Sequence, residues 1–241
     1  MLLATPDGER LLSAVAVPLD LDALVPPVPL EAEAAAASPW EVEIGFGKGR
    51  YLLRRALAEP GTRFLGIELA GEYFRLLATR ARRRGVRNLL AIRGEAQTLL
   101  AAVLPRGFAR AVHVYFPDPW PKARHGRRRL FDAQSVDLVL SLLMPGGTLW
   151  FATDHLAYGE AVEALLAGHP AATVRRRPGG WDEGPRTNYE AKYLAEGRPI
   201  LRLEVTWAGG EGLSALHPAG RAGVLAAYRA SGDGPGAGDA S

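Results

Sequence analysis

A glycine-rich turn is the first feature of the sequence with a chemical use. Residues 41–49 (EVEIGFGKG) pass from an apolar stretch into Gly45, Gly47 and Gly49, and a helical pattern follows. Glycine allows positive φ and close approach of a ligand to the backbone, and the free N–H groups of a following helix favour nucleotide-like ligands. The spacing G-x-G-x-G departs from the G-x-G-x-x-G dinucleotide fingerprint, and a simple tight loop explains this turn alone equally well.

Two acids follow at positions where parallel strands are expected to end. Glu68 closes the segment GIE, 19 residues after Gly49. In a doubly wound sheet such an acid lies beside the first glycine turn and accepts hydrogen bonds from a ribose diol. The glycine turn and Glu68 together therefore favour an adenosine-containing cofactor. Glu95, in the segment GEA, has two open interpretations: a contact to the amino group of adenine, or stabilisation of a helix N-terminus.

The most specific segment is the loop 115–129 (YFPDPWPKARHGRRR). Its three prolines within five residues make it rigid and enclose Asp118. Five bases between Lys122 and Arg129 are too dense for a folded core and suit RNA phosphates, and Trp120 is able to stack on a base. The loop follows an expected strand, at the edge where open sheets bind ligands. A solvated basic loop would explain the bases but not the enclosed acid.

From Trp40 onward, short apolar runs alternate with amphipathic ones, a pattern typical of βαβ units. The pattern predicts an α/β fold with a doubly wound, seven-stranded, mostly parallel sheet. Strands are expected near 41–46, 63–67, 88–93, 109–115, 146–152, 172–176 and 200–206. Helices are expected near 49–58, 71–84, 96–103, 132–143 and 156–168, and the last two strands are joined by a long irregular connection.

The 241 residues suit one domain with additions at both ends. Residues 1–38 contain helix-breaking prolines and are expected to form a partly ordered arm. The domain itself is expected over 39–207. The extension 208–241 has one short helical pattern at 222–228, and its final part has nothing to bury and is expected to be disordered.

Composition excludes several classes of function. The chain has no cysteine, which rules out disulfides, thiolate zinc sites and a cysteine nucleophile, and its five scattered histidines predict no metal site. No apolar stretch approaches the roughly 20 residues of a membrane span. The N-terminal segment lacks the features of a signal peptide, so we expect a cytoplasmic protein. The bases comprise 26 arginines and only 3 lysines, and their clustering is compatible with a polyanionic partner.

Together the motifs resemble the bacterial tRNA (guanine-N7)-methyltransferase family. The resemblance covers about residues 40–205 and rests on EIGFGKG at 43–49, GIE, GEA, the loop at 116–129, ATD at 152–154 and TNYEAK at 187–192. It implies a Rossmann-like class I methyltransferase fold, S-adenosyl-L-methionine as cofactor and tRNA as partner. The implied target is guanine 46 of the variable loop, and no obligate protein partner is expected.

The resemblance also implies roles for individual residues. The cofactor would be held by Glu43, Gly45, Gly47, Gly49, Glu68, Glu95 and Asp118. The target guanosine would be held by Lys122, Asp154, Thr187, Asn188, Tyr189 and Glu190, and RNA would contact Arg124, His125, Arg127, Arg128 and Arg129. The sequence departs from the family pattern at Glu95, where Asp is usual, and at Asn188 and Tyr189, where Lys-Phe is usual.

Methylation of guanine N7 demands little proton transfer, because N7 already has an in-plane lone pair. Positioning must supply most of the acceleration, and the guanine gains positive charge as the methyl group arrives. We therefore expect Asp118 to act as the catalytic residue by stabilising that charge, with Asp154 in a supporting role and Glu190 bonding the donor groups of the base. Lys122 would position a phosphate or base acceptor.

Three other functions use parts of the same motifs. A nicotinamide oxidoreductase would use the glycine turn and Glu68 but not the basic loop. A non-catalytic RNA-binding module would use the arginines but not the cofactor acids. A methyltransferase acting on an exocyclic amine of nucleic acid would also favour an Asp-Pro-aromatic segment, which keeps this alternative open.

Four further expectations concern local structure. Glu41 is predicted at the surface and His113 packed within a strand. The arginine run 80–84 is predicted to be a solvated helix face that is able to widen the RNA footprint. The Gly- and Pro-rich segment 178–190 is predicted to be mobile until tRNA binds.

Overall fold

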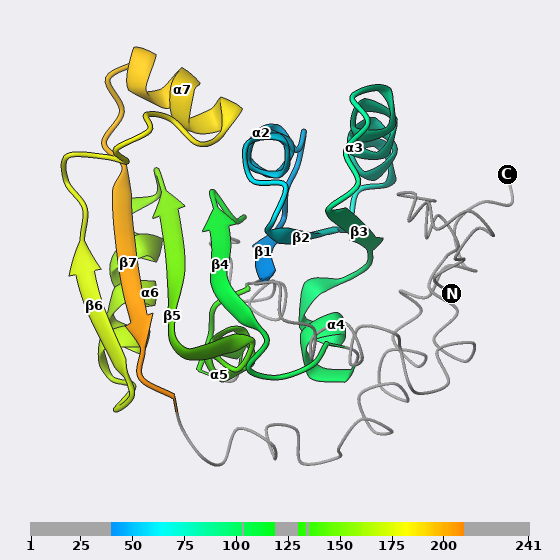
Figure 1. Ribbon diagram of the computed structural model, residues 1–241. Coiled ribbons are helices and arrows are strands. Elements are labelled where there is room, and N and C mark those ends of the chain that lie inside the picture. Colours follow the sequence, from blue (N-terminus) through cyan, green and yellow to red (C-terminus); the bar gives the residue numbers. More distant parts are fainter. Residues whose placement is uncertain (1–39, 103, 119–129, 134, 210–241) are drawn as a thin grey trace, which may run out of the picture.

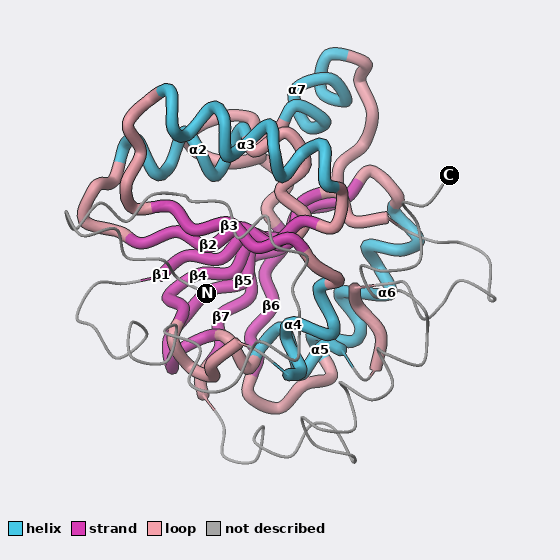
Figure 2. Tube along the Cα trace, turned by 90° about the vertical axis from the view of Figure 1, so that its right-hand side faces the viewer, coloured by secondary structure: helices cyan, strands magenta, loops and turns pink. Residues whose placement is uncertain are grey.

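The alternating pattern forms one sheet of seven strands, with helices on both faces (Figures 1 and 2). The computed structural model describes residues 40–102, 104–118, 130–133 and 135–209. The expected arm at 1–38, the short helix at 222–228 and the basic part of the loop at 119–129 lie outside these residues.

Strand order is β3-β2-β1-β4-β5-β7-β6. β7 runs antiparallel to both of its neighbours, and the remaining neighbouring strands are parallel. The strands are β1 (Trp40–Ile44), β2 (Arg63–Glu68), β3 (Leu89–Arg93), β4 (Ala109–Tyr115), β5 (Leu143–Thr153), β6 (Ala172–Arg176) and β7 (Leu201–Trp207). The sequence placed every strand within three residues of these bounds, and the sheet is mostly parallel as predicted.

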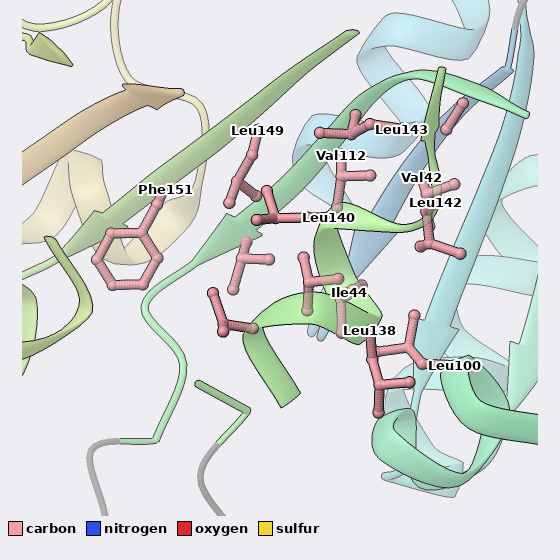
Figure 3. Packing of buried hydrophobic residues seen from close by; sticks show 14 of the residues in the cluster. Val42, Ile44, Leu100, Val112, Leu138, Leu140, Leu142, Leu143, Leu149 and Phe151 are labelled. Atoms are coloured by element: carbon pink, nitrogen blue, oxygen red, sulfur yellow. The ribbon is translucent and has the colours of Figure 1, made fainter. Parts of the chain in front are cut away.

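The helices lie in two layers (Figure 2). On one side of the sheet are α2 (Arg50–Ala58), α3 (Gly71–Arg83) and α7 (Asn188–Ala195), and on the other are α4 (Ala96–Ala102), α5 (Ser135–Leu140) and α6 (Leu156–Ala167). The larger core cluster, partly shown in Figure 3, includes apolar side chains from the central strands and from α5. Parallel strands covered on both faces explain why β4 is almost continuously buried. Within the described residues, every helix is too short or too polar to cross a membrane.

The predicted bounds of one helix and the predicted start of the strand after it are wrong for a local reason. The sequence placed a helix at 132–143 and a strand from 146, but α5 spans only 135–140 and β5 already begins at Leu143. The segment Pro145-Gly146-Gly147 does not end the strand. It forms a bulge, with Gly146 at φ 79°, and the pairing of β5 with β4 shifts there.

Helix α7 replaces part of the connection that the sequence predicted to be irregular. Thr187 caps it, since its hydroxyl accepts a hydrogen bond from the backbone N–H of Glu190 at 3.0 Å. The apolar spacing could not reveal this helix, because Glu190 is its one buried residue. The T-x-x-E capping signature at 187–190 was the available signal.

Candidate active site

Side chains from four strands gather at one edge of the sheet. β2, β1, β4 and β5 are adjacent and parallel, so their carboxyl ends open on the same edge. The glycine turn follows β1, Glu68 ends β2, Asp118 follows β4 and Asp154 follows β5. The topology thus brings together residues that the sequence identified one by one.

The glycine turn adopts backbone conformations that other residues rarely take. Gly45, Gly47 and Gly49 have φ of 74°, 51° and 66°. A Cβ on Gly49 would lie 2.6 Å from Leu77 of α3, whereas a Cβ on Gly45 or Gly47 would meet nothing within 4 Å. One glycine therefore lets α3 pack closely, and the other two leave open space at the end of β1. That space suits a ligand that approaches the backbone.

Glu68 and Glu95 both bind backbone N–H groups. Glu68 accepts from the N–H of Gly47 at 2.8 Å and from that of Ala70 at 2.9 Å, which ties the glycine turn to the end of β2. Glu95 accepts from the N–H groups of Gln97 and Thr98, at 3.0 and 2.6 Å, and so caps α4. The helix-stabilising interpretation of Glu95 is therefore observed, and its contact to adenine stays a prediction.

Glu43 is a buried acid without a complete set of partners. It is 2% exposed in β1, and among the described residues its Oε2 has no hydrogen-bond partner. Burial raises the pKa of Glu43 to about 8, against a hydrogen bond from the backbone of Leu52, and the negative charge of Glu68 adds to the rise. An orphaned acid beside an open glycine turn fits a cationic ligand.

Glu43→Gln is expected to flatten the pH dependence of folding stability. The native carboxyl keeps its proton up to about pH 8, whereas the unfolded chain loses it near 4.5. Between these values the unfolded state binds fewer protons, so stability falls as pH rises, by about 1.4 kcal/mol per pH unit for one group. Glutamine cannot ionise, so this slope disappears. Urea unfolding from pH 5 to 9 measures it, with exposed Glu72→Gln as the control, and parallel curves for Glu43→Gln and wild type would disprove it.

Arg186 is a central residue that the sequence did not reveal. It is 7% exposed, and its guanidinium carbon lies 4.2 Å from the ring centre of Trp181 and 4.7 Å from that of Trp150. Nη1 donates to the hydroxyl of Tyr115 at 2.7 Å, and Nε pairs with Glu183 at 2.6 Å. This enclosed cation anchors the segment 181–190 to the end of β4, immediately before the Asp118 loop.

Glu190 has a different environment from the one expected. It is 1% exposed, and its Oε1 accepts from Nε of Arg202 at 2.7 Å. Its Oε2 accepts from Nε1 of Trp181 at 3.1 Å and from the N–H of Arg186 at 2.8 Å. Because protein donors occupy both oxygens, the geometry favours a role in holding residues 181–190 over a direct contact to guanine. That the segment 178–190 is mobile until tRNA binds stays a prediction.

Helix α7 lies beside the glycine turn and the end of β4 (Figure 1). Asn188 Oδ1 accepts from Nη1 of Arg50, the first residue of α2, at 3.2 Å. Tyr189 is 52% exposed, and its ring centre lies 6.4 Å from that of Phe116. Asp154 pairs with Arg198 at 3.3 Å across the end of β5. Thr187 starts the helix as its cap. The expected guanosine residues 187–189 thus flank the same edge as Asp154.

A buried polar network lies beneath α2 and corrects the prediction for Glu41. Glu41 is 3% exposed and pairs with Arg55 at 2.9 Å and Arg110 at 2.7 Å. His113 contacts Glu41 through Nε2 at 3.2 Å and the hydroxyl of Tyr115 through Nδ1 at 2.8 Å. Burial lowers the pKa of His113, which keeps the packed imidazole neutral. The prediction that His113 is packed is confirmed, and Glu41 is not at the surface.

Several predicted site residues lie outside the described residues: Lys122, expected to hold the guanosine, and the expected RNA contacts Arg124, His125, Arg127, Arg128 and Arg129. Asp118, just before them, is exposed. It follows Phe116, which has an unusual φ of 54° and donates its N–H to the carbonyl of Ala152 in β5 at 2.7 Å. The described end of the loop is therefore fixed to the sheet.

Comparison with known sequences identifies similar proteins over this whole region. A family model described as a putative methyltransferase matches residues 37–203. The tRNA (guanine-N(7)-)-methyltransferase of Nitrosococcus oceani is 38% identical over 162 residues, which are 67% of this chain and 69% of that protein. The enzymes of the same name from Mycolicibacterium paratuberculosis and Bordetella pertussis are both 36% identical, and cover 76% and 73% of this chain and 72% and 71% of their own lengths.

Solved structures of other methyltransferases share the fold. A 16S rRNA (adenine(1408)-N(1))-methyltransferase variant with cosubstrate SAM from Catenulisporales acidiphilia superimposes with a TM-score of 0.54 at 20% identity, and covers 78% of this chain and 94% of that one. The antibiotic-resistance methyltransferase Kmr gives a TM-score of 0.52 at 22% identity, with 76% and 92% coverage. At this identity the likeness concerns the fold alone, and it confirms the predicted Rossmann-like class I methyltransferase architecture.

Proposed function

The chain belongs to the tRNA (guanine-N(7)-)-methyltransferase family, and we propose on this basis that guanine 46 in the variable loop of tRNA is its target. Its activity is the S-adenosyl-L-methionine-dependent transfer of a methyl group to N7 of a guanine in tRNA. The observation that supports the proposed site is the meeting of the glycine turn, Glu68, Asp118 and Asp154 at one edge of the sheet. We further propose a cytoplasmic location and no obligate protein partner.

The residues at the ends of β1 and β2 fit the cofactor. S-adenosyl-L-methionine supplies an activated methyl group on a positively charged sulfur. The orphaned carboxyl of Glu43 suits a cationic group of the cofactor. The open space at Gly45 and Gly47 allows the cofactor to approach the backbone closely. Glu68 would bind the ribose and Glu95 the adenine, each through lone pairs that its backbone contacts leave free.

The protein's part in the reaction is to position and to stabilise charge. N7 of guanine needs no base, so alignment with the methyl group supplies the main acceleration, which reaches about 7–11 kcal/mol in well-oriented systems. Asp118 and Asp154 would stabilise the positive charge that develops on guanine. Thr187, Asn188 and Tyr189 would position the base from α7. Lys122 and the loop bases up to Arg129 would bind RNA acceptors.

Mass spectrometry of a tRNA transcript after incubation with the protein and labelled S-adenosyl-L-methionine tests the whole proposal. The expected product is a single 7-methylguanosine at position 46. Label on an exocyclic amine would instead support the alternative methyltransferase, and tRNA binding without label would support a binding module. Transfer to N7 of another guanine would refute the assigned position alone.

Glu68→Ala is expected to weaken cofactor binding by about 1–3 kcal/mol. The variant loses the hydrogen bonds to the ribose and also the bond that holds Gly47 in the turn. Isothermal calorimetry with S-adenosyl-L-methionine and its demethylated product measures the loss, and the exposed acid Glu72 on α3 provides the control variant, Glu72→Ala. Unchanged affinity in Glu68→Ala would remove this residue from the cofactor site.

A further inference from the structure

The outer face of α3 concentrates positive charge. Residues 71–87 hold six arginines and one acid, Glu72, so this segment has five excess positive charges, whereas the whole chain has only three. All six arginines are exposed in the structure: Arg75, Arg80, Arg82, Arg83, Arg84 and Arg87. The positive character of the protein is therefore unevenly distributed, and α3 is its richest described part.

The exposed arginines of β6 are neutralised by neighbouring acids. Arg175 pairs with Glu204 at 2.7 Å, and Arg176 pairs with Glu163. By contrast, the ion pairs formed within the described part of the chain involve none of the arginines at 75, 80 and 82–84. Like charges three or four residues apart on a helix repel one another. The helix dipole compensates for cations in the last turn but not for Arg75 in the second.

Two guanidinium groups also converge at the start of α3. A Cβ on Gly71 would lie 3.1 Å from Cζ of Arg93 and 3.2 Å from Nη1 of Arg75. Arg93, at the end of β3, also donates to the backbone carbonyl of Leu69 at 3.4 Å. Two cations held around one point form a geometry that a bound phosphate would stabilise.

The α3 arginines are connected to the site by direct contacts. Arg80 Nη1 donates to the backbone carbonyl of Lys48 in the glycine turn at 3.0 Å. Lys48 is exposed, and two residues further Arg50 reaches Asn188 of α7 at 3.2 Å. Figure 2 shows α2, α3 and α7 on the same side of the sheet. The cations Arg80, Lys48 and Arg50 thus connect α3, through the glycine turn, to the helix expected to position the target base.

We propose that this surface binds the RNA backbone as a second contact area, in addition to the basic loop. We define the α3 basic surface by the residues Arg75, Arg80, Arg82, Arg83, Arg84, Arg93, Lys48 and Arg50. This proposal rests on the proposed function, since it assigns the α3 basic surface to parts of tRNA outside the variable loop. With 13 residues, α3 is about 20 Å long, enough to contact several phosphates.

An anionic membrane is the competing partner for a basic helix, and the observations disfavour it. A helix that lies in a membrane needs an exposed apolar face as well as bases. The exposed large apolar side chains of the described residues lie elsewhere, at Leu57, Leu69, Met144, Leu156, Tyr189 and Leu194, and none of them is on α3. A surface of arginines alone suits phosphates held by a polymer.

The test removes three arginines far from the glycine turn. Arg82, Arg83 and Arg84 are replaced together by glutamine, which maintains helix propensity. The matched control replaces Arg175, Arg176 and Arg177 by glutamine, which gives the same change in net charge where arginines pair with acids. Affinity is measured at several salt concentrations for two RNAs. One is a full-length tRNA transcript, and the other is a short RNA hairpin that contains the variable loop without the rest of the tRNA.

We expect the α3 variant to bind full-length tRNA about 10- to 100-fold more weakly near physiological salt. The salt slope, which is the slope of log affinity against log salt concentration, should be smaller in magnitude by about 2–3. Its binding of the hairpin, its affinity for S-adenosyl-L-methionine and its single-turnover rate at saturating tRNA are expected to be unchanged. The control should keep the wild-type salt slope. The proposal would be overturned by equal salt slopes in the α3 variant and wild type, or by an equal loss of tRNA affinity in the control. It would also be overturned if wild-type protein bound vesicles of anionic phospholipid and the α3 substitutions abolished that binding.

The outcome is separable from that of the proposed function. If wild-type protein forms no 7-methylguanosine in tRNA, the proposed function fails whatever the α3 variant does. If wild-type protein methylates tRNA normally and the α3 variant retains its tRNA affinity, the α3 basic surface fails alone.

Discussion

Replacing Asp118 with asparagine is expected to lower the single-turnover rate of tRNA methylation by about 100- to 1,000-fold. The side chain is exposed, so the fold and much of the cofactor affinity should survive. Asparagine keeps the shape of the residue between Pro117 and Pro119 and removes only its charge. The loss would come from a misplaced guanine and from weaker stabilisation of its positive charge.

The pH dependence distinguishes this role from that of a general base. Guanine N7 needs no proton removed, so the wild-type rate should lack a steep dependence on one ionisation. The single-turnover rate of methylation is measured at several pH values for wild type and Asp118→Asn, with Asp182→Asn, a substitution of an exposed acid, as the control. A near wild-type rate in Asp118→Asn would assign charge stabilisation to Asp154. A wild-type rate that follows one ionisation between about pH 6 and 8 would favour the exocyclic-amine reaction.

Replacing Arg202 with methionine is expected to destabilise the fold by about 3–5 kcal/mol. Its ion pair with Glu190 is 2.7 Å long, and the two side chains are 5% and 1% exposed. Removing the cation leaves a buried negative charge, whose desolvation is no longer compensated. Urea unfolding, followed through tryptophan fluorescence, measures the change, and the indole of Trp181 contributes to the signal because it also bonds Glu190.

Two comparisons separate this effect from loss of packing. The double variant Arg202→Met, Glu190→Gln should recover part of the stability, because it contains no uncompensated charge. Arg198→Met removes a more exposed ion pair, 48% and 27% exposed, and should cost about 1 kcal/mol or less. If Arg202→Met costs no more than Arg198→Met, the buried pair does not hold the segment 181–190 in place.

The sequence predicted the sheet well because its signals are local. Short apolar runs, separated by longer amphipathic runs, identify strands and helices wherever each element is buried. The glycine turn and Glu68 followed from their places after β1 and β2, and parallel strands bring their carboxyl ends to one edge. Helix α7 and the bulge at Gly146 were missed, because a helix with one buried residue has no apolar stripe and a Pro-Gly-Gly segment usually ends a strand.

The tertiary structure alone decided which polar side chains are buried and with what partners. Glu41 became a buried acid because Arg110, 69 residues away on the neighbouring strand, pairs with it at 2.7 Å. Arg186 became an enclosed cation through Tyr115, 71 residues earlier in the chain. Burying a charge is favourable only where such partners meet it, and these partners come from segments whose approach no local pattern encodes. The sequence by itself therefore determined the family, the sheet and the edge where the chemistry occurs, while long-range pairing decided how residues 181–190 are held against that edge.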